Sequence, residues 1–307
     1  MIEPDYLIAR LRFRHLRLLT EVQNRGSLRA AALALSLTQP ALSKSLTEIE
    51  SAFGFALFLR TARGLKPTPQ GEVVLRGATM LLHELSHLRA EAASADRFTT
   101  RIRIGAPPFV AQTYLPGVIA KLVQGDVPVG VQLLEERVPA LIGALQRGEL
   151  DALITTFPQQ MLAGQADAFE YTTLFEVQFA VVASVTHPLV RSRRVGWARL
   201  ATERWVMPVE NSMGRKLIED CFTRAGVPAP LPVIESTSPT TSLQFVATGL
   251  GIGIVPDVTL LHHGTLQTGS VKRLRVAPAP HSSVVALICR AGARNPRVAL
   301  LKEALEL

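Results

Sequence analysis

The sequence predicts a mainly helical N-terminal domain, a long connecting helix and a larger C-terminal α/β domain. Apolar residues recur at helical spacing up to about residue 95. From Arg101 onward, strand-like apolar runs alternate with helical segments, the pattern that is typical of an α/β domain. The 307 residues are enough for two domains of roughly 100–200 residues each.

The composition favours a folded, basic protein. Hydrophobic residues make up 48% of the chain and charged residues 19%, so a sizeable core can form. The net charge of +8 favours a polyanionic partner. Residues 1–70 hold 10 Lys and Arg against 5 Asp and Glu, so a net +5 lies in less than a quarter of the chain.

Cysteine usage and the distribution of charge indicate a cytoplasmic protein. Cys221 and Cys289 make no disulfide framework, which suggests a reducing cytosol, and each also suits a buried small apolar position. Asp5 and several arginines interrupt any N-terminal apolar run, so no secretory signal is expected. No uncharged apolar stretch of about 18 residues occurs, so neither a transmembrane helix nor a membrane partner is expected.

The first 35 residues predict two helices. In residues 13–25 the apolar positions lie three apart on one helical face: Phe13, Leu16, Leu19 and Val22. Gly26 can end this helix, and Ser27 can cap a second one over residues 28–35. That second helix is rich in alanine, which allows another helix to approach closely.

A third helix begins at Thr38 and carries two distinct surfaces. Thr38 suits an N-cap, with Pro40 in the first turn, where a missing N–H costs nothing. Its apolar face holds Leu42, Leu46, Ile49 and Phe53, and Gly54 ends it. Its polar surface lies mostly in the N-terminal half and holds Gln39, Ser43, Lys44 and Thr47.

This arrangement suits a helix-turn-helix whose recognition helix enters the major groove with its N-terminus first. Glutamine can pair with adenine, lysine can reach guanine or phosphate, and hydroxyls serve either. The same spacing also suits an ordinary three-helix core with a solvated face. The next segment, "LFLRTARGLKPTPQG", favours the first interpretation, because it predicts a hairpin with Gly64 in its turn and Arg60, Arg63 and Lys66 around it. Such a basic hairpin can act as a wing on backbone phosphates.

Together these segments resemble the N-terminal winged helix-turn-helix of LysR-type transcriptional regulators. The resemblance spans residues 13–75 and rests on "TQPALS", the Ile49–Glu50 end of the third helix, "LFLRTARGLKPT" and the "GE" that opens the linker. Leu59 departs from the family, which often has a polar or acidic residue there. The resemblance implies binding to double-stranded promoter DNA. The expected DNA-binding residues are Ser27, Arg29, Gln39, Pro40, Ser43, Lys44, Thr47, Arg60, Arg63 and Lys66.

Residues 68–96 predict a long linker helix that joins two subunits. Thr68 can cap it, and apolar residues then follow at alternating spacings of four and three, as in a two-stranded coiled coil. The expected seam is Val74, Ala78, Leu81, Leu85, Leu88 and Ala92. Packing on the chain's own domain is the alternative. The resemblance implies a homodimer or homotetramer paired through this helix.

Residues 97–307 predict an effector domain built on parallel strands. The resemblance, carried here by "RIGAPP", "LQRGELDALI", "AVVASVTHPL" and "FVATGLGIGIVP", implies two Rossmann-like subdomains with a small-molecule cleft between them, a periplasmic-binding-protein-like arrangement. Subdomain I is expected at about 101–173 and 272–307, and subdomain II at about 174–271.

Open α/β sheets bind ligands at the carboxyl ends of their strands. The expected effector-binding residues are therefore Pro107, Pro108, Phe109, Arg137, Val138, Thr155, Thr156, Ser236, Thr237 and Ser238. Their hydroxyls and nearby helix N-termini suit a small organic anion. The hydroxyls of residues 236–238 equally suit N-capping, and Phe109 equally suits the core. For Arg137 a surface ion pair with Glu135 or Glu136 is the favoured alternative.

No enzyme activity, cofactor or metal is expected. The sequence lacks GxSxG, a CxxC pair, a P-loop and a GxGxxG after a strand. The expected function is regulation of transcription in response to an effector. RNA polymerase is a further candidate partner at the promoter. Two alternatives stay open: a solute-binding-like α/β protein, which leaves the first 95 residues unexplained, and an architectural DNA-binding protein that senses no small molecule.

Overall fold

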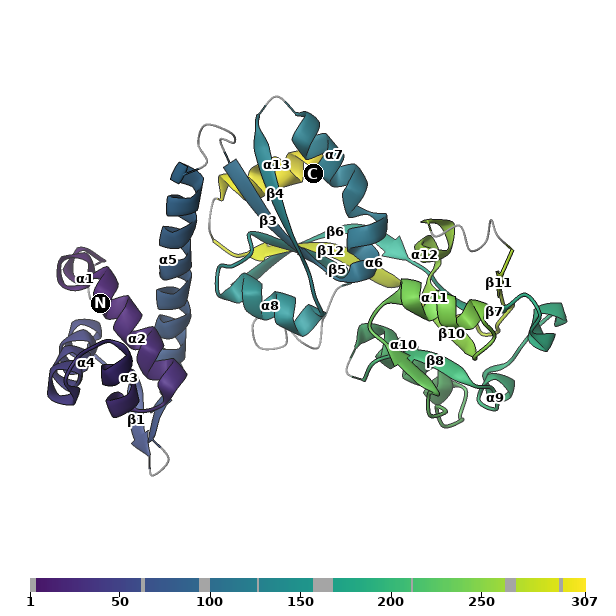
Figure 1. Ribbon diagram of the computed structural model, residues 1–307, viewed down its shortest axis with the longest axis horizontal. Helices are drawn as coiled ribbons and strands as arrows, with labels where there is room; N and C mark the ends of the chain where they lie inside the picture. Colours follow the sequence, from purple (N-terminus) through teal and green to yellow (C-terminus); the bar gives the residue numbers. More distant parts are fainter. Residues whose placement is uncertain are drawn as a thin grey trace. The chain divides into compact units, whose positions relative to one another are not determined.

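The computed structural model describes residues 4–61, 64–93, 100–125, 127–156, 168–210, 212–262, 269–292 and 295–307. The chain divides into two compact units, one of residues 1–99 with 146–150, and one of residues 100–145 with 151–307. Figure 1 shows a helical unit with one small hairpin and an α/β unit with two sheets. None of the helices in the described part of the chain combines the length and apolar character that crossing a membrane requires.

The N-terminal unit is a helical domain with a short hairpin. Its elements are α1 (Pro4–Arg10), α2 (Phe13–Arg25), α3 (Leu28–Ala34), α4 (Gln39–Phe53), β1 (Phe58–Thr61), β2 (Gly64–Pro67) and α5 (Pro69–Ala93). Its core contains the predicted apolar positions Leu19, Val22, Leu42 and Ile49. Phe13 was also expected on the apolar face of the first helix, but its side chain is 57% exposed because it stands at the start of α2.

Two contacts fix the hairpin against the helices. The Oε1 atom of Glu50 accepts hydrogen bonds from the backbone N–H groups of Leu57 (2.7 Å) and Phe58 (3.2 Å), which ties the end of α4 to β1. The Leu65 N–H donates to the carbonyl oxygen of Gly26 at 2.8 Å, which ties β2 to the turn between α2 and α3. Gly64 makes this approach possible, because a Cβ there would collide with the Gly26 carbonyl.

Helix α5 begins where the hairpin ends. Thr68 accepts a hydrogen bond from the Gly71 N–H at 2.8 Å and so caps the first turn. A side chain at Gly71 would collide with the carbonyl oxygen of Leu57. The "GE" of the family-like pattern therefore has a steric reason: only glycine lets α5 pass this close to the hairpin.

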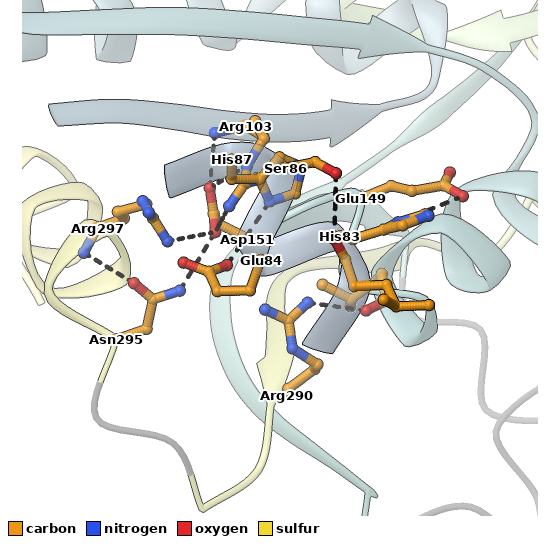
Figure 2. A network of polar contacts seen from close by, with 12 residues as sticks. His83, Glu84, Ser86, His87, Arg103, Glu149, Asp151, Arg290, Asn295 and Arg297 are labelled. Atoms are coloured by element: carbon orange, nitrogen blue, oxygen red, sulfur yellow. Dashed lines mark hydrogen bonds and ion pairs between the residues drawn. The ribbon is translucent and has the colours of Figure 1, made fainter. Parts of the chain in front are cut away.

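Subdomain I of the α/β unit is a five-stranded sheet in the order β4-β3-β5-β12-β6. The strands are β3 (Thr100–Ala106), β4 (Val129–Glu135), β5 (Ala152–Thr156), β6 (Phe169–Val177) and β12 (Ser283–Arg290). Its helices are α6 (Pro108–Thr113), α7 (Leu115–Gln124), α8 (Val138–Gln146) and α13 (Pro296–Ala304). Figure 2 shows a buried polar cluster beside β3 and the start of β5, where Asn295 and Arg297 approach the carboxylate of Asp151 beside Arg103.

Subdomain II is a second five-stranded sheet in the order β11-β7-β10-β8-β9. The strands are β7 (Phe179–Ser184), β8 (Trp205–Pro208), β9 (Ile234–Ser236), β10 (Ile252–Pro256) and β11 (Val271–Arg273). The helical segments are η2 (Pro188–Arg191), α9 (Trp197–Leu200), α10 (Met213–Arg224), α11 (Pro239–Ala247) and α12 (Asp257–His262). Trp197 and Trp205 each pack edge-on against Phe222 in its core.

The strand pairing corrects two expectations. Both sheets are mixed, because β12 runs antiparallel to β5 and β6, and β7 runs antiparallel to β10 and β11. The chain passes between the sheets at Gln178, which separates β6 from β7, and again between Val276 and Ser283. These crossings lie beyond the expected boundaries at 174 and 272, because β6 and β11 pair further along the chain than their apolar patterns indicate.

Candidate functional sites

Helix α4 presents a polar surface to solvent. Gln39, Pro40, Lys44 and Thr47 are exposed and Ser43 is half-buried, whereas Leu42, Leu46 and Ile49 are buried. Thr38 caps the helix as predicted, accepting from the Ala41 N–H at 3.3 Å. The Thr47 hydroxyl donates to the Ser43 carbonyl at 3.1 Å, so it remains available outward only as an acceptor. The first half of α4 therefore offers an amide, an ammonium group and hydroxyls on one accessible surface.

Basic and hydroxyl groups flank this surface. Ser27 stands at the N-cap of α3, but its side chain makes no capping hydrogen bond, so the hydroxyl is free to meet a phosphate. Arg29 on α3, Arg60 on β1 and Lys66 on β2 are exposed. Arg63, expected at the tip of the hairpin, lies outside the described residues.

Two exposed leucines beside α4 were not predicted as site residues. Leu33 is 83% exposed at the end of α3, and Leu37 is 44% exposed in the turn before α4. Apolar side chains in such a place can contact thymine methyl groups. The sequence "AALALSL" contains a sign of this exposure, because its leucines stand two residues apart and a helix cannot bury all of them on one face.

One motif of catalytic type was missed in the sequence. Residues 83–87 read "HELSH", which matches the HExxH pattern of zinc metalloproteases. On α5 the rings of His83 and His87 lie 6.3 Å apart between centroids, and Glu84 Oε2 approaches His87 Nδ1 at 3.6 Å. Among the described residues no three His, Cys, Asp or Glu side chains gather in a group that could hold a metal ion. The pattern alone therefore does not make a catalytic zinc site.

The expected seam on α5 divides into two parts. Val74 is half-buried against the domain's own core and Ala78 is buried, so these two residues are already packed within the protomer. Leu81, Leu85 and Leu88 are 48%, 44% and 56% exposed, and Ala92 is also exposed. The unpacked apolar stripe is thus the C-terminal part of the seam.

A cavity of about 240 Å³ lies between the two subdomains of the α/β unit. Subdomain I contributes Pro107, Pro108, Phe109, Glu136, Arg137, Val138, Pro139, Ala140 and Thr156. Subdomain II contributes Phe179, Pro208, Val209, Glu210, Ser212, Met213, Gly214, Ser236, Thr237, Pro239, Ser242, Ile254 and Pro256. Most of these residues stand at strand ends, where α6, α8, α10 and α11 begin. Across the subdomains, the Thr240 hydroxyl donates to Gln112 Oε1 at 2.8 Å.

The cavity contains eight of the ten expected residues and leaves out Thr155 and Ser238. Thr155 neighbours Thr156 on β5, so its side chain points to the opposite face of the sheet, where it is buried. Ser238 caps α11 by accepting from the Thr241 N–H at 3.3 Å. Ser236 lines the cavity, but its hydroxyl donates to the Ser238 carbonyl at 3.2 Å. Thr156 and Thr237 are thus the expected hydroxyls best placed to serve a ligand.

The charges at the cavity are few. Arg137 is exposed and, among the described residues, its side chain forms no ion pair with Glu135 or Glu136; only its backbone N–H meets Glu136 Oε2, at 3.2 Å. Glu136 and Glu210 add two carboxylates. Arg215, which follows the cavity residue Gly214 in α10, is already paired with Glu219 and Glu235, each at 2.8 Å.

Prolines limit the hydrogen bonds that the helix ends offer. Pro108, Pro139 and Pro239 occupy the first two positions of α6, α8 and α11, so each of these helices lacks one free N–H. Helix α10 instead begins with Met213 and Gly214, whose N–H groups have no partner within the helix. The start of α10 therefore offers an anionic group more free N–H donors than the starts of α6, α8 and α11.

A winged helix-turn-helix with exposed hydrogen-bonding groups, joined to a two-subdomain ligand cleft, defines a ligand-responsive DNA-binding protein. Residues 13–72 match the "Bacterial regulatory helix-turn-helix protein, lysR family". Residues 95–306 match the "LysR substrate binding domain". The chain belongs to the LysR family of bacterial transcriptional regulators.

Similar proteins are of the same kind. The transcriptional regulator GbpR of Azospirillum brasilense is 30% identical over 244 residues, which is 79% of this chain and 70% of that protein. MetR of Salmonella typhimurium is 31% identical over 257 residues, 80% of this chain and 75% of that one. Full-length OxyR from Pseudomonas aeruginosa shares the fold, with a TM-score of 0.64, 24% identity and coverage of 97% and 95% of the two chains.

The protein is therefore a DNA-binding transcriptional regulator with an effector-binding domain. A solute-binding-like protein, the first alternative, does not account for the matched helix-turn-helix.

Proposed function

We propose that α4 reads bases in the major groove of promoter DNA, with Gln39, Lys44 and Ser43 as the reading side chains. The supporting observation is their accessibility on the first half of α4, while the other half of the helix surface is buried in the core. Ser27, Arg29, Arg60 and Lys66 then bind backbone phosphates on either side and position the helix. Arg63 has the same role by its place in the sequence.

Two such domains act together through α5. Leu81, Leu85 and Leu88 form an exposed apolar stripe that a second copy of α5 would cover. A dimer places two recognition helices on two half-sites about one helical turn apart, or a multiple of that distance. Tetramers would form as pairs of such dimers. Bound at a promoter, they would alter the access of RNA polymerase or its recruitment.

The effector that suits the cleft is a compact organic acid with an apolar body and a single anionic group. Proline, valine, phenylalanine and isoleucine side chains make up much of the wall, which favours an apolar body. Arg137, Thr156, Thr237 and the first N–H groups of α10 can hold one carboxylate. Glu136 and Glu210 would repel a second carboxylate. A cavity of about 240 Å³ admits only a small molecule of this kind.

Calorimetric titration tests this proposal. Benzoate-like monocarboxylates should bind the wild type, and dicarboxylates of similar size should bind at least tenfold more weakly. Thr156→Val and Thr237→Val should each weaken binding of the monocarboxylate, by about 1.5–3 kcal/mol for a lost hydrogen bond to a charged group. Thr155→Val is the matched control, because that side chain lies outside the cavity.

Three outcomes would contradict the proposal. Equal affinity in the two cleft variants and the wild type would move the site elsewhere. Tighter binding of dicarboxylates would mean that the cleft is more positive than its side chains indicate. Failure of all acids to bind, with DNA binding intact, would favour a neutral effector or an architectural protein that senses none.

A further inference from the structure

The segment before the matched helix-turn-helix is rich in arginine. Residues 10–17 read "RLRFRHLR", with four arginines and no acidic residue. The family match begins at residue 13, so α1 and the link to α2 are an addition to the matched region. Nothing in the proposed reading of DNA by α4 and the hairpin uses this segment.

The segment has a defined place on the domain. Helix α1 packs against α4. The Leu11 N–H donates to the Leu7 carbonyl at 2.8 Å, and the Leu11 side chain packs against the domain core. The Arg10 guanidinium carbon lies 4.6 Å from the centre of the Tyr6 ring, within the range of a cation–π contact. The arginines are therefore carried on an ordered support beside the recognition helix.

The positive charge of this segment is not neutralised within the described part of the chain. Arg10, Arg12 and Arg14 are exposed, and none of them forms an ion pair with another described residue. Arg12 is the N-cap of α2, and no acidic residue stands in the first turn of that helix. Cations near the positive end of a helix dipole are destabilising, so this placement disfavours the free protein and suits an anionic partner.

The pKa of the neighbouring His15 is lowered, in part by the positive charge of this segment. Burial is the largest cause that lowers the pKa of His15, and the charges of Arg14 and Arg12 lower it further. Glu48 on α4 acts in the opposite direction and is the weakest of these influences. The pKa of His15 is thus lowered more by the two arginines than Glu48 raises it.

The position of α1 relative to the hairpin completes the argument. In Figure 1, α1 and the β1–β2 hairpin lie at opposite ends of the domain, with α4 between them. The hairpin carries Arg60 and Lys66. Arg10 ends α1, Arg12 is the N-cap of α2, and Arg14 lies in the first turn of α2.

We propose that Arg10, Arg12 and Arg14 form a second phosphate clamp on promoter DNA, on the flank of α4 opposite the wing. Guanidinium groups bind phosphate oxygens in a bidentate manner, so three of them suit a sugar–phosphate backbone. Such contacts add affinity and fix orientation without reading sequence. This inference rests on the proposed entry of α4 into the major groove, which brings the flanking backbone within reach.

The test compares two variants with the same change of charge. Arg10→Gln/Arg12→Gln/Arg14→Gln removes the clamp. Arg191→Gln/Arg193→Gln/Arg194→Gln removes three exposed arginines from the effector-binding domain. The probe is a labelled duplex that the wild-type protein selects from a random-sequence pool. DNA affinity is measured from about 50 to 300 mM salt, and thermal melting checks that both variants fold.

The clamp variant should bind the duplex at least tenfold more weakly at about 150 mM salt. The slope of log affinity against log salt should become shallower by about 5 for a dimer that loses three phosphate contacts per subunit. The control variant should keep the wild-type slope, and both should keep the wild-type base preference. A wild-type salt slope in the clamp variant, or an equal loss of DNA affinity in both variants, would overturn the clamp. The base preference of a Gln39→Ala variant is a separate measurement, which tests only the proposed role of α4.

Discussion

The carboxylate of Asp151 accepts three hydrogen bonds from Arg103 in the interior of subdomain I. The Arg103 backbone N–H and Nε both donate to Oδ2 at 2.9 Å, and Nη2 donates to Oδ1 at 2.7 Å. The two side chains are 0% and 5% exposed. The pair joins β3 to the residue that precedes β5, so it holds together the two strands whose ends reach the cleft.

Asp151→Ala should lower the free energy of unfolding by about 3–5 kcal/mol, because it removes the carboxylate from a buried ion pair. Glu149→Ala is the matched control. That carboxylate is 36% exposed, and losing its contact with Arg147 should cost at most about 1 kcal/mol. Urea denaturation followed by circular dichroism measures the free energy of unfolding of both variants. Equal decreases would mean that the buried pair contributes no more to stability than the exposed one.

Gln39→Ala should remove discrimination at one base pair of each half-site, by about 1–3 kcal/mol, because a bidentate contact to adenine is lost. Lys66→Ala should weaken binding to all sequences alike, since lysine on the hairpin meets phosphate. Binding to single-base variants of a selected duplex distinguishes the two. An unchanged base preference after Gln39→Ala would mean that Gln39 does not contact a base and only forms part of the first turn of α4.

Leu85→Glu should dissociate the dimer, because it places a charge in the proposed apolar seam of α5. Ser86→Glu is the matched control: it adds the same charge on an exposed position about 100° around the same helix. Sedimentation velocity should show monomers only for the first variant, with tight DNA binding lost in parallel. A Leu85→Glu protein that sediments like the wild type would leave the α/β unit as the assembly surface.

Hydrogen peroxide should leave DNA binding unchanged, although the fold is shared with OxyR proteins. Burial raises the pKa of Cys289 to about 11 and also raises that of Cys221, so little reactive thiolate is present at neutral pH. The two thiols lie in the cores of different subdomains. Mass spectrometry under native conditions should find no disulfide. A peroxide effect that disappears in Cys221→Ala would contradict this expectation.

The DNA-binding half was readable from sequence because its signals are local. The Thr38 cap depends on neighbours three residues away, and the apolar stripe of α4 follows helical spacing. The strands Phe58–Thr61 and Gly64–Pro67 pair as the predicted hairpin, and Gly64 has the positive φ that its place beside the turn requires. The "HELSH" pattern is also local and visible in the sequence. Whether a third metal ligand lies beside its two histidines depends on residues distant in the sequence, and the described residues provide none.

The effector half depended on pairing between distant segments. Residues 169–184 are two strands separated by one residue, and only their partners, β12 and β10, assign them to different sheets. Which of Thr155 and Thr156 faces the cleft follows from the register with β12, because side chains alternate along a strand. Helical spacing, turn residues and the family-like motifs therefore determined the winged helix-turn-helix from sequence alone, because all of them are local signals, whereas long-range strand register decided the walls of the cleft.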